Sequence, residues 1–135
     1  MEESELLQSI TEMLMSFKFQ TDINGFEYLR SAIVLCYQDE QLKNNISKKV
    51  YPMVAEMHNS NAQTVERGMR TAIENCYNCG GLLEINEVFG IVVYKNDFKW
   101  TNSEMISLFV EILKIQKQRQ LLNEKLIQLK QEENK

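Results

Sequence analysis

A chain of 135 residues with 44% hydrophobic residues can form one domain with its own core and is too short for two complete ones. One proline and five glycines are too few for a turn-rich β-sandwich, so the many long aliphatic residues favour an all-α fold. The formal net charge of −4, taken alone, argues against binding to nucleic acid. Neither a signal peptide nor an apolar run of the roughly 20 residues that span a bilayer is found, so we expect a cytoplasmic protein without membrane contact.

Charge is unevenly distributed along the chain. Residues 1–42 contain eight acidic and two basic side chains, whereas residues 43–70 contain five basic and two acidic ones. Residues 71–100 have a net charge of −2, and residues 101–135 have a net charge of +1. The positive excess is therefore concentrated in one stretch, which is where a contact with nucleic acid would be expected.

Apolar residues recur at helical spacing along most of the chain, with polar or glycine breaks between the segments. The helical segments expected from this spacing are 5–19, 26–37, 46–51, 52–58, 62–79, 82–88 and 102 to the C-terminus. Pro52 divides the third region into two pieces because proline favours the first turn of a helix. Gly80 and Gly81 end the longer helix before them. Residues 91–94 look extended but have no partner strand, so we expect a packed loop there.

Two of these segments, 52–58 and 62–79, have the features of a helix-turn-helix, in which a second helix crosses the first closely. Ala55 supplies the small residue at the crossing, and Asn59 tolerates the left-handed backbone that a tight turn needs. Ser60 or Asn61 can cap the second helix and leave its N-terminus directed at a phosphate group.

The second helix of this unit has two distinct faces. The residues expected to face the core are Val65, Met69, Ile73 and Cys76. The residues expected on the opposite face are Gln63, Glu66, Arg67, Arg70 and Thr71. Arginine can donate two parallel hydrogen bonds to guanine, so Arg67 and Arg70, three residues apart, are candidates for contacting bases.

The same spacing also fits an ordinary helical hairpin with a solvated face. Glu66 illustrates the ambiguity, because it can accept a hydrogen bond from a cytosine amino group or pair with Arg70 one turn later. Spacing alone leaves both interpretations open.

The residue inventory disfavours an enzyme. Cys76 and Cys79 form a C-x-x-C motif, but zinc needs about four ligands and the only further candidates are Cys36 and His58. No strand precedes the motif, so we expect two reduced cysteines near a helix end. His58 is the only histidine and is expected to pack at a helix end. We therefore expect no catalysis, cofactor, metal or small-molecule substrate.

Five short segments carry a family resemblance: Gly25–Arg30, Tyr51-Pro52 with Ala55, Val65-Glu66-Arg67 with Arg70, Phe89-Gly90, and Thr101–Glu104. Together they resemble the C-terminal DNA-binding effector domain of the stage-zero sporulation response regulator of endospore-forming bacteria. The resemblance covers residues 9–117 and needs no gap after Gly25. The last segment, Thr-Asn-Ser-Glu, is also a capping box that starts the final helix.

The resemblance implies a six-helix domain that controls transcription, with a recognition helix in the major groove of double-stranded DNA. Members of the family bind tandem sites as head-to-tail dimers. By position, Glu66, Arg67 and Arg70 inherit the base-contacting role, and Lys99 becomes a candidate for a phosphate contact. The DNA-binding candidates from both lines of argument are Ser60, Asn61, Gln63, Thr64, Glu66, Arg67, Arg70, Thr71 and Lys99. The resemblance places the candidate contacts with the RNA polymerase sigma subunit at Glu84, Phe89 and Val93.

The chain departs from the family pattern on the recognition helix itself. Thr64 stands where the family has another base-contacting arginine, and Thr71 replaces a histidine. Gly68 replaces an alanine, at an expected cost of roughly 0.5–1 kcal/mol of helix stability. Lys18-Phe19-Gln20 replaces a glycine-valine-proline segment. The preferred DNA sequence is expected to differ from that of the family.

The alternative function is an interaction module that no longer binds DNA and modulates a full-length regulator or RNA polymerase. Thr64 and the acidic first third of the chain favour this alternative, whereas Arg67, Arg70 and the local basic excess oppose it.

The chain begins almost at the effector domain, without the family's receiver domain, so we expect no regulation by aspartyl phosphorylation. It also continues beyond the resemblance, and we divide it into an effector-like unit, 1–118, and a helical extension, 119–135. A coiled-coil-like stripe runs into this extension, and its candidates for homodimer contacts are Ile115, Leu122, Leu126 and Leu129. The alternative is an amphipathic helix that folds back onto its own domain.

Overall fold

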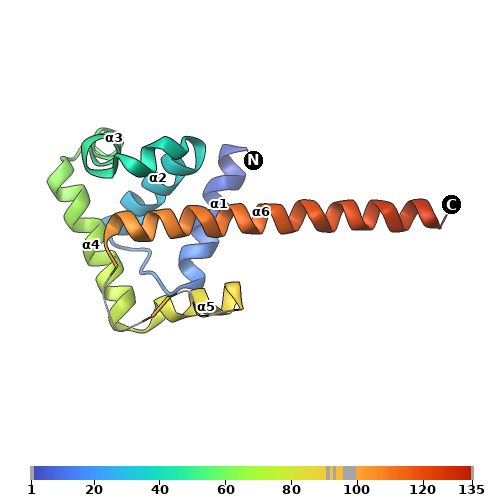
Figure 1. Cartoon of the computed structure of the whole chain (residues 1–135). Coiled ribbons are helices and arrows are strands. Elements are labelled where there is room, and N and C mark those ends of the chain that lie inside the picture. The colour runs from blue at the N-terminus through green and yellow to red at the C-terminus, as the bar shows by residue number, and fades with distance from the viewer. Residues whose placement is uncertain (1, 91, 93, 96–99, 135) are drawn as a thin grey trace.

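The computed structural model describes residues 2–90, 92, 94, 95 and 100–134, and every regular element in these residues is helical (Figure 1). The all-α class predicted from the sequence is confirmed. The α-helices are α1 (Glu3–Ser16), α2 (Asn24–Gln38), α3 (Tyr51–Met57), α4 (Ala62–Asn78), α5 (Glu84–Phe89) and α6 (Asn102–Glu133). Short helical turns of other types are η1 (Glu40–Asn44), η2 (Ile46–Val50) and η3 (Gly81–Leu83). None of the helices in these ranges combines the length and apolar character needed to cross a bilayer.

The first helix ends earlier than its apolar spacing predicts. α1 stops at Ser16, and Lys18 has a φ of 66°, in the left-handed region that an α-helix does not use. Phe17 and Phe19 remain buried although they lie outside the helix, because both rings pack against Phe109 of α6 at centroid distances of 6.1 and 5.8 Å. Their apolar spacing therefore reflects core packing beyond the end of α1.

The division predicted at Pro52 is confirmed as a change of helix type. The π-helical turn η2 runs directly into α3, with Pro52 in the first turn of α3. A proline is tolerated there because a first-turn amide has no partner inside its own helix. Val50 and Val54, on either side of the junction, are both fully buried.

α2 and α4 cross in close contact at two glycines. A Cβ atom on Gly25 would overlap the carbonyl oxygen of Gly68 and would lie 3.0 Å from the Cβ of Ala72. A Cβ atom on Gly68 would lie 2.9 Å from a ring carbon of Tyr28. The glycine that departs from the family pattern at position 68 thus has a packing reason, since a side chain there would press against Tyr28.

The chain after α4 follows the predicted order of elements. Gly80 has a φ of 76° and follows Cys79, the C-cap of α4, as expected for a glycine just past a helix C-terminus. The helix predicted for 82–88 is present as η3 followed by α5. Tyr94 is buried outside any helix, and its backbone N–H and carbonyl each hydrogen-bond the Asn86 side chain at 2.8 Å. Ile91 and Val93 of the predicted loop lie outside the described residues.

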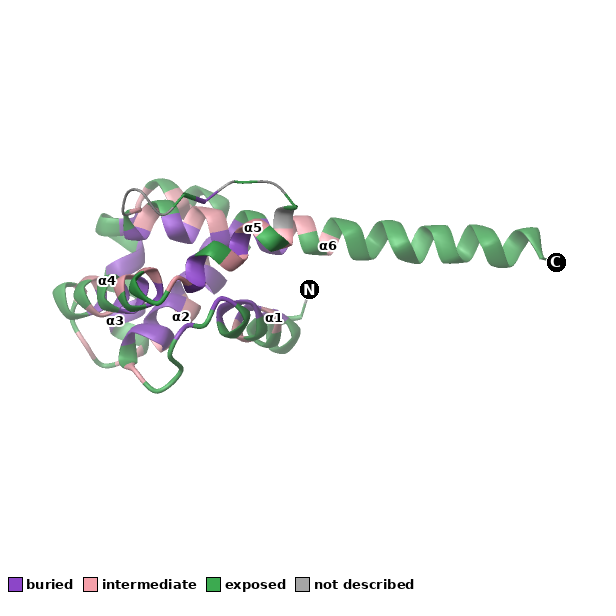
Figure 2. Ribbon diagram, turned by 90° about the horizontal axis from the view of Figure 1, so that it is seen from below, coloured by how far each residue is buried: buried purple, intermediate pink, exposed green. Residues whose placement is uncertain are grey.

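The N-terminal half of α6 provides the middle of the core. The predicted capping box is confirmed, with Thr101 and Glu104 each accepting a hydrogen bond from the other's backbone N–H. Six apolar side chains of α6 are buried in the domain: Met105, Ile106, Phe109, Val110, Ile112 and Leu113. Figure 2 shows that this buried portion is confined to the half of the helix inside the domain.

Beyond the domain, α6 continues straight away from it as one exposed helix (Figures 1 and 2). All residues from Gln118 to Asn134 are exposed. Arg119 makes the last polar contact with the domain, donating from Nη1 to the carbonyl oxygen of Val88 at 3.4 Å. The alternative in which the extension folds back onto its own domain is therefore wrong.

Candidate nucleic-acid interface

The turn between α3 and α4 is shaped by asparagines. Asn59 has a φ of 51°, which is the left-handed conformation predicted for it. Asn61 caps α4, because its Oδ1 accepts a hydrogen bond from the backbone N–H of Thr64 at 2.9 Å. Ser60 uses its backbone instead, and its N–H donates to the carbonyl of Ala55 at 2.9 Å. Of the two predicted caps, Asn61 is the one that the structure uses.

The inward face of α4 is buried in the core. Val65, Met69, Ile73 and Cys76 are buried, as predicted, and Ala72 joins them. This face packs against α2 and α3, so the neighbouring helices hold α4 in one orientation. The opposite face must then point outward, whatever its side chains contact.

The structure gathers the predicted polar side chains on that outward face. The exposed ones are Gln63, Thr64, Arg67, Arg70 and Thr71. Glu66 is half-buried at the edge of the same face. All six side chains lie within two and a half turns of one helix, between residues 63 and 71. They could therefore contact a single groove of a DNA duplex together.

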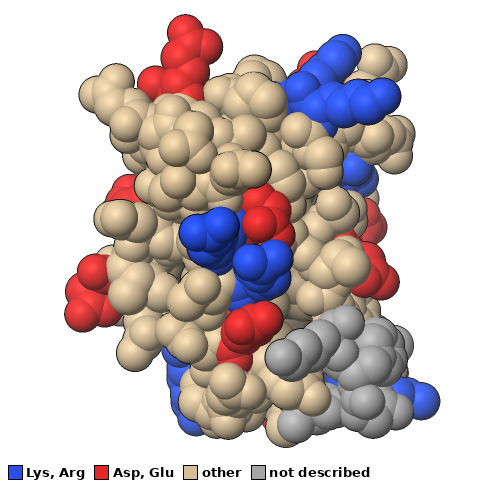
Figure 3. Space-filling model, turned by 90° about the vertical axis from the view of Figure 1, so that its left-hand side faces the viewer, with Lys and Arg blue, Asp and Glu red and all other residues tan. Residues whose placement is uncertain are grey.

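The two arginines have different electrostatic surroundings. Arg70 donates from Nη1 to the Glu66 carboxylate at 3.0 Å, and the side chains are 52% and 36% exposed. Within the described part of the chain, Arg67 forms no ion pair and is exposed. On the face of the molecule that carries α4, basic side chains lie directly beside acidic ones (Figure 3). The local field is therefore mixed, and Arg67 is the guanidinium group available without breaking an existing pair.

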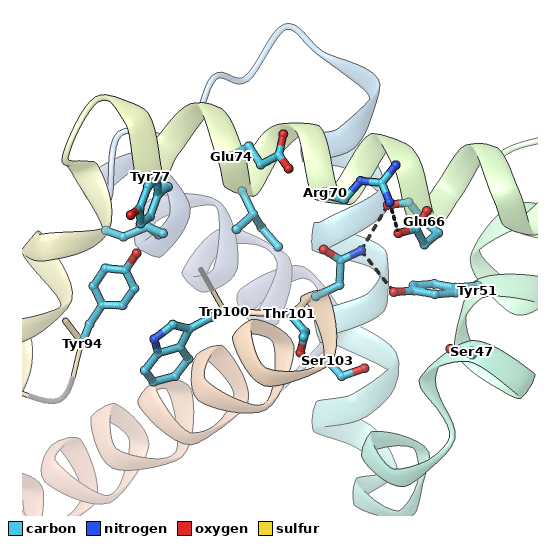
Figure 4. Close-up of a pocket in the computed structure, with 13 residues that line it drawn as sticks. Ser47, Tyr51, Glu66, Arg70, Glu74, Tyr77, Tyr94, Trp100, Thr101 and Ser103 are labelled. Atoms are coloured by element: carbon cyan, nitrogen blue, oxygen red, sulfur yellow. Dashed lines mark hydrogen bonds and ion pairs between the residues drawn. The ribbon is translucent and has the colours of Figure 1, made fainter. Parts of the chain in front are cut away.

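A buried asparagine fastens the start of α6 to this unit. Asn102 is only 8% exposed, and its side-chain amide donates to the Tyr51 hydroxyl of α3 and to the Glu66 carbonyl of α4, both at 3.1 Å (Figure 4). Burial raises the pKa of the Tyr51 hydroxyl, so it stays protonated at neutral pH. Sequence reasoning missed Asn102, although a polar residue inside the capping box and next to an apolar stripe was a signal that could have found it.

Two hollows flank α4. One, of about 430 Å³, lies beside the Asn102 junction and has Arg70, Tyr94 and Trp100 among its walls (Figure 4). The other, of about 300 Å³, lies between α2 and α4, and Arg67 and Gly68 line it. The exposed face of α4 is therefore bordered on both sides by concave surface.

Cys76 and His58 pack against neighbouring elements, whereas Cys79 lies at the surface. The Cys76 thiol is buried and donates to the carbonyl oxygen of Phe17 at 2.8 Å, and burial raises its pKa to about 12. Cys79 is exposed. His58 shares a hydrogen bond of 2.8 Å with Ser31 Oγ and packs edge-on against Tyr28. Within the described residues, no cluster of three or more His, Cys, Asp or Glu side chains could hold a metal ion.

The remaining predicted residues do not belong to α4. Lys99, Val93 and the side chain of Phe89 fall outside the described parts of the chain. Glu84, at the start of α5, forms an ion pair of 3.8 Å with Lys18. The candidates for dimer contacts are half-buried at Ile115 and exposed at Leu122, Leu126 and Leu129.

Two helices joined by a tight turn, with the second buried on one side and polar on the other, are the arrangement that compact, all-α DNA-binding domains of the helix-turn-helix class share. Residues 10–113 match the family model described as sporulation initiation factor Spo0A C terminal. The chain belongs to this family, which consists of DNA-binding effector domains of sporulation regulators and is not a family of enzymes. The resemblance predicted over residues 9–117 is confirmed over nearly the same range.

Proposed function

We propose that this chain is a sequence-specific DNA-binding regulator of transcription, with α4 lying in the major groove. The observation that carries the proposal is the division of α4 into a buried apolar face and an exposed face with two arginines. Membership of the family supports the proposal, because a DNA-binding role is what the family has in common.

The ion pair between Arg70 and Glu66 does not prevent Arg70 from contacting a base. An exposed pair of this kind contributes about 0.2–1 kcal/mol, whereas a bidentate contact with guanine discriminates by about 1–3 kcal/mol. Exchanging the carboxylate for guanine is therefore favourable at a matching site. Arg67 needs no such exchange, so we assign it the leading role, with Gln63, Thr64 and Thr71 beside it.

Selection of bound sequences from a random DNA pool, followed by gel shifts at several salt concentrations, tests this proposal. We expect one enriched motif, and a logarithmic affinity that falls with the logarithm of salt by about 0.9 for each phosphate contacted. No enrichment, together with no binding at low salt, would refute DNA binding. That result would favour the alternative function, an interaction module that no longer binds DNA. The Arg70–Glu66 ion pair and the acidic first third of the chain are consistent with that alternative.

We also propose that the protein is a homodimer, with residues 1–118 as the DNA-binding unit and residues 119–135 as the dimerisation extension. The exposed leucines of the extension support this, because an isolated helix of that kind leaves its apolar side in water. Sedimentation of a chain truncated after Gln118 tests it. We expect the full chain to sediment as a dimer and the truncated chain as a folded monomer. If both chains had the same oligomeric state, the assignment of residues 119–135 to dimerisation would be refuted.

A contact with the sigma subunit of RNA polymerase is proposed for the surface around Glu84, Phe89 and Val93. It rests on the family relationship and on the Glu84 side chain at the start of α5, which is 44% exposed. Glu84→Ala is expected to weaken binding of the purified sigma subunit while DNA binding stays unchanged, and unchanged sigma binding would count against this surface.

A further inference from the structure

The exposed part of α6 carries an apolar stripe. Leu122, Leu126 and Leu129 follow one another at spacings of four and three residues and are 58%, 46% and 57% exposed. At 3.6 residues per turn, these side chains lie along one side of the helix. Ile115, half-buried where α6 leaves the domain, begins the same side. We call these four residues the leucine stripe.

The leucine stripe points away from the face that α6 buries in its own domain. Each residue turns the helix by about 100°, so the stripe lies roughly 150° around the axis from the mean direction of the buried set 105–113. Outside the domain, the side that continues the buried set is mainly polar and carries Gln120, Glu124 and Gln131, with Ile127 between them. While α6 remains one continuous helix, its own domain cannot cover the leucine stripe.

The stripe has the repeat of a helix that pairs with another helix. Ile115, Leu122 and Leu129 are seven residues apart and occupy the d positions of a heptad, while Arg119 and Leu126 occupy the a positions. We infer that Leu122, Leu126 and Leu129 pack in antiparallel orientation against the same segment of a second copy of this chain, so that Lys125 faces the partner's Glu132. The inference rests on the homodimer proposed above and is independent of DNA binding.

Charges beside the stripe disfavour the parallel orientation. In this heptad, Lys125 occupies a g position and Lys130 an e position. In a parallel pair, each g position faces the e position five residues later in the other helix, so Lys125 would face the partner's Lys130. The a-position Arg119 would also meet the partner's Arg119. Both contacts bring like charges together, and neither has an acidic side chain in the facing position.

The antiparallel orientation removes both conflicts. Facing g positions then pair Lys125 with the partner's Glu132, and the two-fold axis makes this contact twice. In the same register, Leu126 packs opposite the partner's Leu129 and Leu122 faces the partner's Glu133, while Ile115 lies beyond the end of the overlap. Arg119 lies beyond the end of the overlap and keeps its contact with Val88. The two Leu126–Leu129 contacts and the flanking charges therefore favour the same arrangement.

Reversing one charge distinguishes the arrangements. Lys125→Glu is expected to weaken self-association of the full chain about tenfold at low salt, because two exposed attractions become repulsions. Lys125→Glu with Glu132→Lys restores the opposite charges and is expected to return the dimer to wild-type strength. Glu124→Lys, on the opposite side of the helix, is the matched control and is expected to leave association unchanged.

Sedimentation equilibrium measures these constants, and circular dichroism checks that each variant keeps its helix content. Tighter association of Lys125→Glu would mean that the new carboxylate at position 125 meets the partner's Lys130, and the antiparallel pairing would be wrong. Unchanged association, or no rescue by the double variant, would also overturn it. A wild-type chain that stays monomeric would refute the homodimer itself, and gel shifts report DNA binding separately.

Discussion

The backbone of Gly68 occupies the space that a side chain on Gly25 would need, so α2 and α4 are in direct backbone contact. This contact brings the start of α2 against the middle of α4, next to Arg67. The position of the proposed recognition helix therefore depends on a residue far earlier in the chain, and not on the turn alone.

Gly25→Ala is expected to lower the free energy of unfolding by about 1–3 kcal/mol, because the obstacle to its new methyl group is backbone that cannot rotate away. Gly68→Ala is the matched comparison. Its methyl group meets the side chain of Tyr28 and not backbone, and alanine adds about 0.5–1 kcal/mol of helix propensity, so we expect a smaller loss than for Gly25→Ala. Thermal denaturation followed by circular dichroism measures both. Equal melting temperatures for Gly25→Ala and wild type would show that the helices do not touch at this point.

Arg67→Ala is expected to abolish selection of a specific DNA sequence while leaving the melting temperature unchanged, because the side chain is exposed and unpaired within the described residues. Arg70→Ala is expected to relax the preference at one base pair, at a cost of about 1–3 kcal/mol. Gel shifts on the selected sequence and on a scrambled one measure the effects. Lys130→Ala, which removes a positive charge from the distant extension, is the control. A normal footprint from the double arginine variant would rule out α4 as the recognition helix.

Glu66→Gln is expected to tighten binding to random-sequence DNA several-fold, since it frees Arg70 and removes a negative charge near phosphate groups. The salt dependence should become steeper at the same time. Titration of a labelled duplex at several salt concentrations tests this. If the variant instead loses affinity only for the selected sequence, Glu66 contacts a base and is not a partner of Arg70 in the complex.

One thiol is expected to react rapidly with Ellman's reagent at pH 8, and two only after unfolding. Cys79 is exposed, whereas burial raises the pKa of Cys36 to about 11 and that of Cys76 to about 12. Cys79→Ser should remove the rapid phase and leave stability unchanged. Three thiols reacting at one rapid rate would contradict the buried positions of Cys36 and Cys76.

The buried thiols of Cys36 and Cys76 are expected to lower the free energy of unfolding in alkaline solution. Because folding disfavours the thiolate forms, their contribution is complete below the ordinary thiol pKa of 9.0 and is lost as the pH rises from there toward 12. Denaturant unfolding at pH 8 and pH 10 should show a lower free energy of unfolding at the higher pH. Replacing Cys76 with alanine should reduce that difference.

Local sequence features predicted the helices and the turn well. The capping box at Thr101, the left-handed Asn59 and the cap at Asn61 each involve partners within three residues, so short segments contain the whole interaction. The end of α1 was misplaced because Phe17 and Phe19 are apolar for a tertiary reason, their contact with Phe109.

By itself, the sequence determined the all-α class, the order of the helices, the two faces of α4 and the family. These follow from periodicity and capping, which act over one or two helical turns, and from short motifs that the family shares. Only the tertiary structure decided that Gly25 meets Gly68, that Asn102 joins Tyr51 to Glu66, and that the leucine stripe stays uncovered. Such contacts depend on how distant helices cross, and the spacing of apolar residues along α2 or α4 does not specify which residues of the two helices meet.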